Sequence, residues 1–328
     1  MTASEKPLLV GSGEFTYRLQ EGFAANWITD DAAGVAVDSQ DRVYVLNRSV
    51  EHPVIVFDSE GNRLGSWGAG MFRRAHAIFS AEDDTLYCVD DQGHSVRQFT
   101  TDGELLLEIN TADHPADTGY VPGQLDSVCR AGPPFNTPTG VAVTTGGDIL
   151  VSDGYGNACI HRFNRSGELL HTFGEPGHGP GQFVLPHGVA VDQDDRILVA
   201  DRENSRVQVF LPDGTFVDQW VAPRASCFLM DPRGHLFVTE MGEVMQGPPG
   251  NKHLAMQLPR ARVTVRDAQG EVLAELLPGD PEGAGLFFSP HSIAQDSLGN
   301  LYVSEVSDSF SGGLAPRDRP RLHKYYRN

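Results

Sequence analysis

The chain repeats one pattern six times, and this repetition restricts its fold more than any other feature. An apolar segment, a turn and a second apolar segment recur, for example as GVAVDSQDRVYVLN, GVAVTTGGDILVSD and GVAVDQDDRILVAD. After a spacer, each copy continues with further segments around a Gly-containing turn, as in VIVFDSEGNRLGSW. Such turns supply the positive φ that tight hairpins require. Four short antiparallel strands make one propeller blade, so the sequence predicts an all-β, six-bladed β-propeller.

The repeat predicts a single domain over residues 1–328. The predicted blades cover approximately residues 34–68, 77–109, 140–174, 188–220, 227–277 and 292–328. The sixth copy lacks its last strand, whereas the strand-like segment 14–23 has no blade of its own. We expect this N-terminal segment to close the ring as the missing outer strand, because closure removes an exposed sheet edge. This repeat pattern resembles the NHL-repeat propellers over nearly the whole chain.

Three interruptions break the period, at residues 110–137, 242–259 and 306–319. Loops of this length in a compact domain usually carry function or are disordered. We expect them to act as lids over one face of the ring, with plain solvated loops as the alternative.

The charge balance limits the possible partners. The chain has 25 Lys and Arg against 44 Asp and Glu, a net charge of −19, which repels nucleic acids and anionic membrane surfaces. A carboxylate-bearing substrate would therefore need arginines inside its site. The N-terminus lacks the features of a signal peptide, and the four cysteines form no CxxC pair, which favours a reducing cytoplasm. The sequence leaves the oligomeric state open.

Aligning the copies places histidines in one register. The residues just before the innermost predicted strands are Ala33, His76, Thr139, His187, Ser226 and His291. Alternate blades of a six-bladed ring lie about 120° apart, so three imidazoles at this position can converge near the axis. Such a set can bind one divalent metal ion and leave positions for water or substrate. The alternative is that each histidine only hydrogen-bonds the backbone.

A second column of residues ends the next predicted strand. It contains Asn47, Asp90, Asp153, Asp201, Glu240 and Glu305. Because all six copies carry an acidic or amide residue there, we predict a structural role, such as accepting backbone N–H bonds between blades.

The position after this column varies and indicates function. It holds Arg48 in the first copy and Arg202 in the fourth, and Tyr155 follows it by one residue in the third. Arginine can bind a carboxylate through two hydrogen bonds. A tyrosine near cations can serve as a base. The alternatives are a surface ion pair for Arg48, pairing of Arg202 with a neighbouring carboxylate, and simple packing of Tyr155.

Several of these segments resemble those of a known enzyme family. PGQF-x-x-PH followed by ADREN-x-R-x-Q, together with SDGY-x-N, is similar to peptidyl-α-hydroxyglycine α-amidating lyase. The resemblance implies a six-bladed propeller with His76, His187 and His291 on zinc and Tyr155 as the base. It also implies substrate-binding or electrostatic roles for Arg48 and Arg202. The family reaction splits an N-acyl-α-hydroxyglycine into a primary amide and glyoxylate.

Two departures from the family pattern affect what the resemblance implies. Ser292 stands where the family has an aspartate that helps to hold a structural calcium ion, so a calcium bound by the carbonyls of Val35 and Ile78 is doubtful. Gly156 stands where animal enzymes have a disulfide cysteine.

These observations together predict a metal-dependent lyase, with zinc as the first choice of metal. The expected substrate is a small carbinolamine or α-hydroxyglycine-like carboxylate, cleaved at its C–N bond to release glyoxylate or a related oxo acid. Two alternatives remain: a metal-dependent hydratase or lactonase-type hydrolase on the same propeller, and a non-catalytic NHL binding module.

Overall fold

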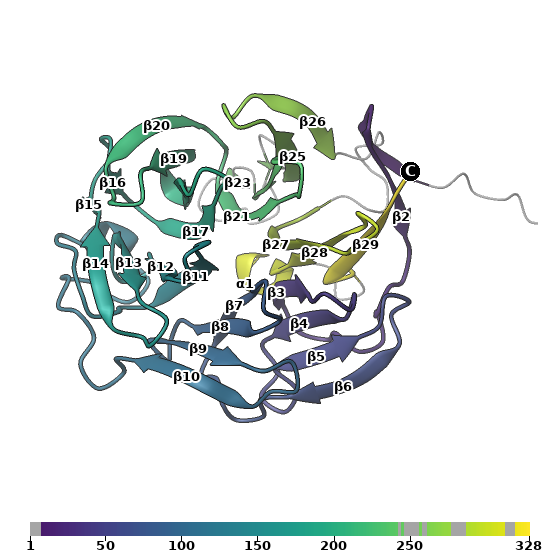
Figure 1. Cartoon of the computed structure of the whole chain (residues 1–328), viewed down its shortest axis with the longest axis horizontal. Helices are drawn as coiled ribbons and strands as arrows, with labels where there is room; N and C mark the ends of the chain where they lie inside the picture. The colour runs from purple at the N-terminus through teal and green to yellow at the C-terminus, as the bar shows by residue number, and fades with distance from the viewer. Residues whose placement is uncertain (1–7, 242–243, 246–255, 258–260, 277–286, 312–318) are drawn as a thin grey trace, which may run out of the picture.

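The computed structural model describes residues 8–241, 244–245, 256–257, 261–276, 287–311 and 319–328. Six antiparallel sheets stand around a central axis as the blades of a propeller, which confirms the predicted fold (Figure 1). Helical structure in these residues is limited to α1 (Ser307–Ser311) and two single turns, η1 (Leu125–Ser127) and η2 (Arg202–Asn204).

Each blade runs outward from its innermost strand. The first three blades are β3 (Ala32–Val37), β4 (Val43–Asn47), β5 (Val54–Phe57) and β6 (Arg63–Trp67); β7 (Ala75–Ser80), β8 (Leu86–Asp90), β9 (Ser95–Phe99) and β10 (Leu105–Asn110); and β11 (Pro138–Val143), β12 (Ile149–Asp153), β13 (Cys159–Phe163) and β14 (Leu169–Phe173). The next two are β17 (Pro186–Val191), β18 (Ile197–Asp201), β19 (Arg206–Phe210) and β20 (Phe216–Val221); and β21 (Ala225–Met230), β22 (Leu236–Glu240), β25 (Arg262–Arg266) and β26 (Val272–Leu276). Two-residue strands form two small extra sheets: β15 (Glu175–Pro176) with β16 (Gln182–Phe183), and β23 (Val244–Met245) with β24 (Met256–Gln257).

The sixth blade joins the two ends of the chain. It consists of β27 (Pro290–Gln295), β28 (Leu301–Glu305) and β29 (Leu322–Arg327), to which β2 (Phe15–Gln20) adds as the fourth strand. Strand β2 pairs antiparallel with β29, and β1 (Leu9–Ser12) adds a further strand outside it. The predicted closure by the N-terminal segment is therefore confirmed, with Phe15–Gln20 as the closing strand.

Packing between blades explains the apolar pattern of the repeat. The second strand of every blade is buried along its full length, because neighbouring blades cover both of its faces. Tyr302 of β28, for example, lies in one apolar cluster with Val45 of β4 in the next blade. The innermost strands are neighbours all around the ring, including β27 beside β3. Residues that begin these strands therefore share one end of the axis.

The three segments that interrupt the repeat differ in the structure that they contain. Segment 110–137 contains η1, and segment 306–319 contains α1 at its start. Of segment 242–259, only the short strands β23 and β24 are described, and its predicted role as a lid lies outside the described residues. Within the described part of the chain, no helix is long and apolar enough to cross a membrane.

Candidate active site

The three histidines of the sequence register meet at the axis. His76, His187 and His291 lie at the starts of β7, β17 and β27, and one ring nitrogen of each lies within 4.8 Å of those of the other two. Their ring centroids are separated by 4.8 to 5.0 Å. All three side chains are at least 97% buried, since their exposed fractions are 0, 2 and 3%.

The blades between the histidines fix the orientation of each ring. Nδ1 of His76 lies 2.7 Å from the carbonyl oxygen of Thr139, and Nδ1 of His187 lies 2.8 Å from that of Ser226. Nδ1 of His291 lies 2.7 Å from that of Ala33. A carbonyl oxygen only accepts, so each Nδ1 must carry the hydrogen, which leaves the Nε2 lone pair on the side of the other rings. This donor set fits a divalent metal ion bound by three neutral imidazoles.

Burial and mutual repulsion keep these rings neutral. Burial lowers the pKa of His76 well below its ordinary value, and the positive charges of His291, His187 and nearby arginines lower it further. The pKa of His187 is likewise lowered well below the ordinary value by burial and then by Arg202. Burial lowers the pKa of His291 to about 3. Neutral imidazole is the form that binds metal ions.

Tyr155 lies directly against the histidines. Its hydroxyl is 3.1 Å from Nε2 of His76 and 3.5 Å from Nε2 of His187. Since Nδ1 of His76 holds the hydrogen, the tyrosine hydroxyl donates to Nε2 in this structure. The phenol ring lies between two guanidinium groups, with the Cζ atoms of Arg74 and Arg202 at 5.5 and 5.6 Å from its centroid.

Acidic neighbours hold the arginines in place. Nη1 of Arg48 donates to Asp31 at 2.9 Å and also to the hydroxyl of Ser309 in α1. Nε of Arg202 donates to Glu203 at 2.9 Å. Burial acts to lower the pKa of Arg202, but the charges of Tyr155 and Glu203 raise it above its ordinary value. Arg202 and Tyr155 are therefore electrostatically coupled.

Arg74 is a site residue that the sequence reasoning missed. It lies two residues before His76, and its Nε donates to both carboxylate oxygens of Asp91 at 2.8 Å. Asp91 stands at the same repeat position as Arg48 and Arg202. The acidic residue at that position marked Asp91 as unusual, but nothing in the repeat alignment pointed to Arg74 as its partner.

The second column positions the histidines indirectly. Asp90 accepts bonds from the backbone N–H groups of Arg73 and Arg74, which stand three and two residues before His76. Asp201 likewise accepts from the N–H groups of Val184 and Leu185, which precede His187. Glu305 accepts from those of Phe288 and Ser289, which precede His291. These N–H groups belong to the connections from the preceding blades, as the structural prediction expected. Glu240 differs, because it accepts from the side chains of Arg262, Thr264 and Arg266.

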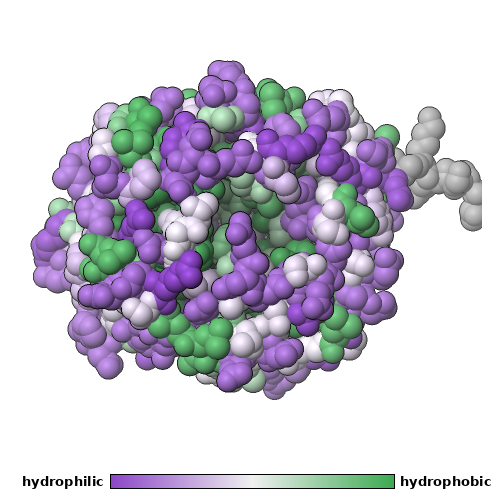
Figure 2. Space-filling model, viewed as in Figure 1, coloured by the Kyte–Doolittle hydropathy of each residue, from purple (hydrophilic) through white to green (hydrophobic). Residues whose placement is uncertain are grey.

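A cavity of about 800 Å³ gathers most of the predicted residues. Arg48, Tyr155, Arg202 and His291 line it, whereas His76 and His187 are reached through the Tyr155 hydroxyl. Other lining residues come from the interruptions, including Tyr120, Leu125 and Phe310. Of the described residues around this cavity, none is Asp or Glu. In the view of Figure 2 the molecule is hollowed at the centre of the ring, with hydrophobic residues on the inner walls.

Ser292 stands where the family resemblance implies an aspartate that helps to hold a calcium ion. Its hydroxyl lies 3.4 Å from the carbonyl oxygen of Val35 and donates to it. The Ser292 oxygen also accepts from the Val35 N–H at 3.3 Å. A neutral hydroxyl thus occupies the position of the family carboxylate.

Comparisons with known proteins identify similar chains. Residues 135–163 and 183–210 match the family model of the NHL repeat. NHL repeat-containing protein 3 of Homo sapiens is 30% identical over 313 residues, which cover 88% of this chain and 81% of that protein. Peptidyl-alpha-hydroxyglycine alpha-amidating lyase 1 of Drosophila melanogaster is 32% identical over 167 residues, or 47% of this chain and 28% of that enzyme. A solved gluconolactonase from Xanthomonas campestris superposes with a TM-score of 0.62 at 15% identity, covering 99% of this chain and 96% of that one, and shows the fold alone.

Proposed function

The chain belongs to the NHL repeat-containing proteins, and from this premise we propose that it is a metal-dependent lyase that cleaves the C–N bond of an α-hydroxyglycine-like substrate. The observation that carries the proposal is the convergence of three neutral histidines beside Tyr155, at the edge of a cavity that Tyr155 and three arginines line. The similarity to amidating lyases supports this reaction class.

A divalent ion, with zinc as the first choice, would be held by His76, His187 and His291 and would act as a Lewis acid toward the substrate hydroxyl. The three backbone carbonyls behind the rings keep the Nε2 atoms turned toward that position. Such hydrogen bonds orient metal-binding histidines and increase their basicity.

The arginines provide the charge complement of a carboxylate. Arg48, Arg74 and Arg202 all line the cavity, although the chain as a whole has a net charge of −19. Arg202 uses only its Nε for Glu203, so its two terminal nitrogens are not part of that ion pair. We assign binding of the substrate carboxylate to Arg202. Arg48, which follows the second strand of the opposite blade, contributes positive potential.

Tyr155 is the group that moves the proton. In its ionised form it takes the proton of the substrate hydroxyl, and the electrons of that O–H bond form the new C=O bond. The C–N bond breaks, and its electron pair goes to the amide nitrogen. The same proton then passes from Tyr155 to nitrogen, which gives a primary amide and an oxo acid without consumption of water. Arg74 and Arg202 stabilise the phenolate during this transfer.

A glyoxylate-release assay with simple N-acyl-α-hydroxyglycines tests the proposal. Wild-type protein loaded with zinc should release glyoxylate and primary amide in equal amounts. The His187→Ala/His291→Ala double variant should lose this activity, while His171→Ala, a change at an exposed histidine on β14, should keep it. Full activity in the double variant contradicts the proposal.

A lactonase-type hydrolase is the second candidate function. It would have to activate water through the metal ion, because the described lining contains no carboxylate. Asp31, Asp91 and Glu203, the acidic groups behind the lining, are each paired with an arginine. Reaction in ¹⁸O-water separates the two functions by label entry during turnover. Hydrolysis introduces the label by bond formation, whereas the lyase reaction releases unlabelled amide.

A non-catalytic NHL module would have no use for the neutral histidine cluster, and it should purify without metal.

The proposed compartment is the cytoplasm, since all four cysteines are unpaired. Fractionation of cells that produce the protein tests this assignment.

A further inference from the structure

Blade 3 differs from the other blades in how its buried acidic residue is compensated. Four carboxylates of the second column have an arginine nitrogen nearby, in the pairs Asp90–Arg97 (3.6 Å), Asp201–Arg206 (3.0 Å), Glu240–Arg262 (2.8 Å) and Glu305–Arg319 (3.7 Å). Asn47 of the first blade is neutral and needs no cation. Asp153 is fully buried, and in the described part of the chain its ion pairing is limited to His161 at 3.3 Å.

The strand register shows which residue has replaced the arginine. Asp201 is the pairing partner of Arg206 across β18 and β19, and Glu240 is the partner of Arg262 across β22 and β25. In blade 3 the partner of Asp153 is Cys159. A buried thiol therefore occupies the place where the fourth and fifth blades put a guanidinium group.

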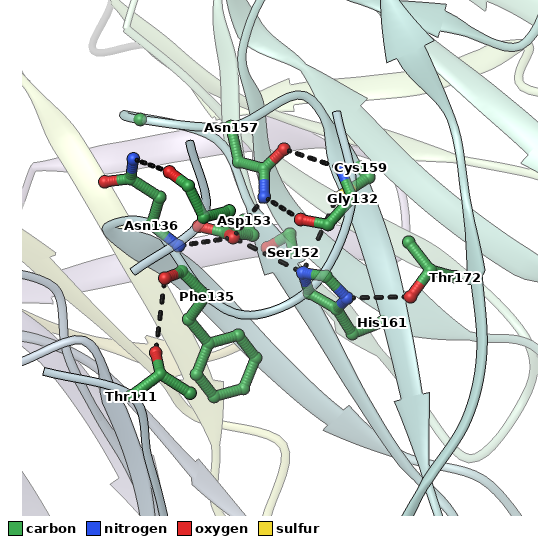
Figure 3. Close-up of polar contacts among 12 residues, drawn as sticks. Thr111, Gly132, Phe135, Asn136, Ser152, Asp153, Asn157, Cys159, His161 and Thr172 are labelled. Carbon is green, nitrogen blue, oxygen red and sulfur yellow. Dashed lines mark hydrogen bonds and ion pairs between the residues drawn. The ribbon is translucent and has the colours of Figure 1, made fainter. Parts of the chain in front are cut away.

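The three side chains meet at separations near the long end of the hydrogen-bond range (Figure 3). Sγ of Cys159 lies 3.5 Å from Nε2 of His161, and that nitrogen lies 3.3 Å from Oδ2 of Asp153. In blade 6, by contrast, Nε2 of His323 bonds Glu305 directly at 2.7 Å. Zinc bonds of about 2.3 Å to sulfur and 2.0 Å to nitrogen and oxygen give tetrahedral edges of about 3.5 and 3.3 Å.

Two further atoms favour a bound cation. Nδ1 of His161 lies 2.9 Å from the hydroxyl of Thr172, which can accept its hydrogen and leave the Nε2 lone pair toward Asp153 and Cys159 (Figure 3). Oδ1 of Asp153 is buried and has no hydrogen-bond partner. Both oxygens of Asp201, by contrast, accept hydrogen bonds, Oδ1 from the N–H groups of Val184 and Leu185 and Oδ2 from the side chains of Asn204 and Arg206. An unpartnered buried carboxylate oxygen is costly unless a cation binds it.

We propose that Asp153, Cys159 and His161 form a second metal site, a structural zinc site in blade 3 that takes the place of the missing arginine. Binding converts the Cys159 thiol to a zinc-bound thiolate and releases its proton to solvent. Asp153, Cys159 and His161 each supply one donor atom, and a fourth ligand would complete a tetrahedral site. The site ties β12 to β13 two residues before Tyr155, and Oδ2 of Asp153 also accepts from the N–H of Asn136.

Cobalt substitution tests the site independently of the proposed function. A thiolate ligand gives Co²⁺ a sulfur-to-metal charge-transfer absorption that a three-histidine centre cannot produce. Protein made in cobalt-supplemented medium should show this band, and so should the His187→Ala/His291→Ala variant. The band should disappear in Cys159→Ser and persist in Cys129→Ser, which changes an exposed cysteine. Absence of the band from wild-type protein, or its survival in Cys159→Ser, overturns the proposal.

A second variant controls for loss of folding. Cys159→Arg recreates the arginine of the fourth and fifth blades, so the chain should keep the wild-type circular dichroism and lack the cobalt–thiolate band. Its metal content should fall by about one ion per chain relative to wild type. A folded Cys159→Arg protein with undiminished metal content contradicts a site at Asp153, Cys159 and His161.

Discussion

At the scale of single residues, the site combines groups whose charges are set by their neighbours. The histidines are neutral because they are buried together, and the arginines are held by carboxylates that are not part of the described cavity lining. Tyr155 is the residue that contacts both sets, through His76 and through the guanidinium groups of Arg74 and Arg202. Replacement of Tyr155 would therefore separate the proposed catalysis from the proposed metal binding.

Tyr155→Phe should lower kcat about 10²- to 10⁴-fold, the usual range for loss of a positioned acid–base group, with metal content unchanged. Tyr120→Phe is the matched control, since Tyr120 also lines the cavity and its hydroxyl accepts a bond from the N–H of Gly123. Steady-state kinetics and elemental analysis of both variants measure the effect. Equal losses in the two variants would argue against a role for Tyr155 in proton transfer.

The histidines also predict how stability depends on pH. The pKa of His291 is lowered from 6.5 to about 3, so between these values the unfolded chain binds a proton that the folded chain does not. The free energy of unfolding of metal-free protein should therefore fall as the pH is lowered through 6.5. From pH 7.5 to 5.5 this one group should account for about 1.4 kcal/mol. Denaturant unfolding in the presence of a chelator should show a shallower pH dependence for His291→Gln, and parallel curves would contradict the assignment.

At the scale of strands and connections, the acidic column acts as a set of clamps. In the three histidine-bearing blades, the carboxylate that ends the second strand binds the backbone just before the histidine. The position of each imidazole therefore depends on the pairing of the first two strands and on one carboxylate.

Asp201→Ala should release the connection before His187 and weaken metal binding at the axis about 10- to 100-fold, as loss of an outer-shell partner usually does. Asn47→Ala is the control, because its blade carries Ala33 in place of a histidine. Competition with a chromophoric chelator measures both affinities. If the two variants bind metal equally well, the clamps do not position the histidines.

The repeat register made much of this site predictable. Residues at one repeat position lie at one radius and height, so His76, His187 and His291 could be expected to converge before their distances were known. Tyr155 and Arg202 followed from the variable position next to the acidic column. The pairing of Arg74 with Asp91 could not be predicted, because it joins two residues of one blade that the alignment treats as separate columns. The loss of the arginine opposite Asp153 becomes visible only when the pairing of β12 with β13 is known.

At the scale of the whole molecule, the blades are held together by contacts at the rim as well as by the core. The outer turn of one blade packs on an aromatic residue at the end of the preceding blade. A Cβ on Gly270 would lie 2.5 Å from the ring of Trp220, and one on Gly214 would lie 2.7 Å from that of Phe173. Both glycines have positive φ, of 83° and 84°. Absence of a side chain at these turns lets adjacent blades meet.

Gly270→Ala should destabilise the ring by about 1–3 kcal/mol more than Gly181→Ala, because the added methyl group overpacks the blade contact. Gly181 is a matched control, since its φ is 74° and a Cβ there meets nothing within 4 Å. The backbone strain is thus similar in the two variants, and thermal unfolding reports the difference. Equal stabilities of the two variants would show that the contact between Gly270 and Trp220 can accommodate a methyl group without loss of stability.

The central claim, a metal centre formed by alternate blades at the axis, is tested most directly by elemental analysis in a Cys159→Ser background. That background removes the proposed blade 3 site and leaves the three histidines as the proposed ligands. Purified Cys159→Ser protein should contain about one divalent ion per chain, as a single three-histidine site requires. Addition of His187→Ala and His291→Ala should remove it. Retention of a full equivalent of metal by the folded triple variant, or a metal-free Cys159→Ser protein, would contradict the account.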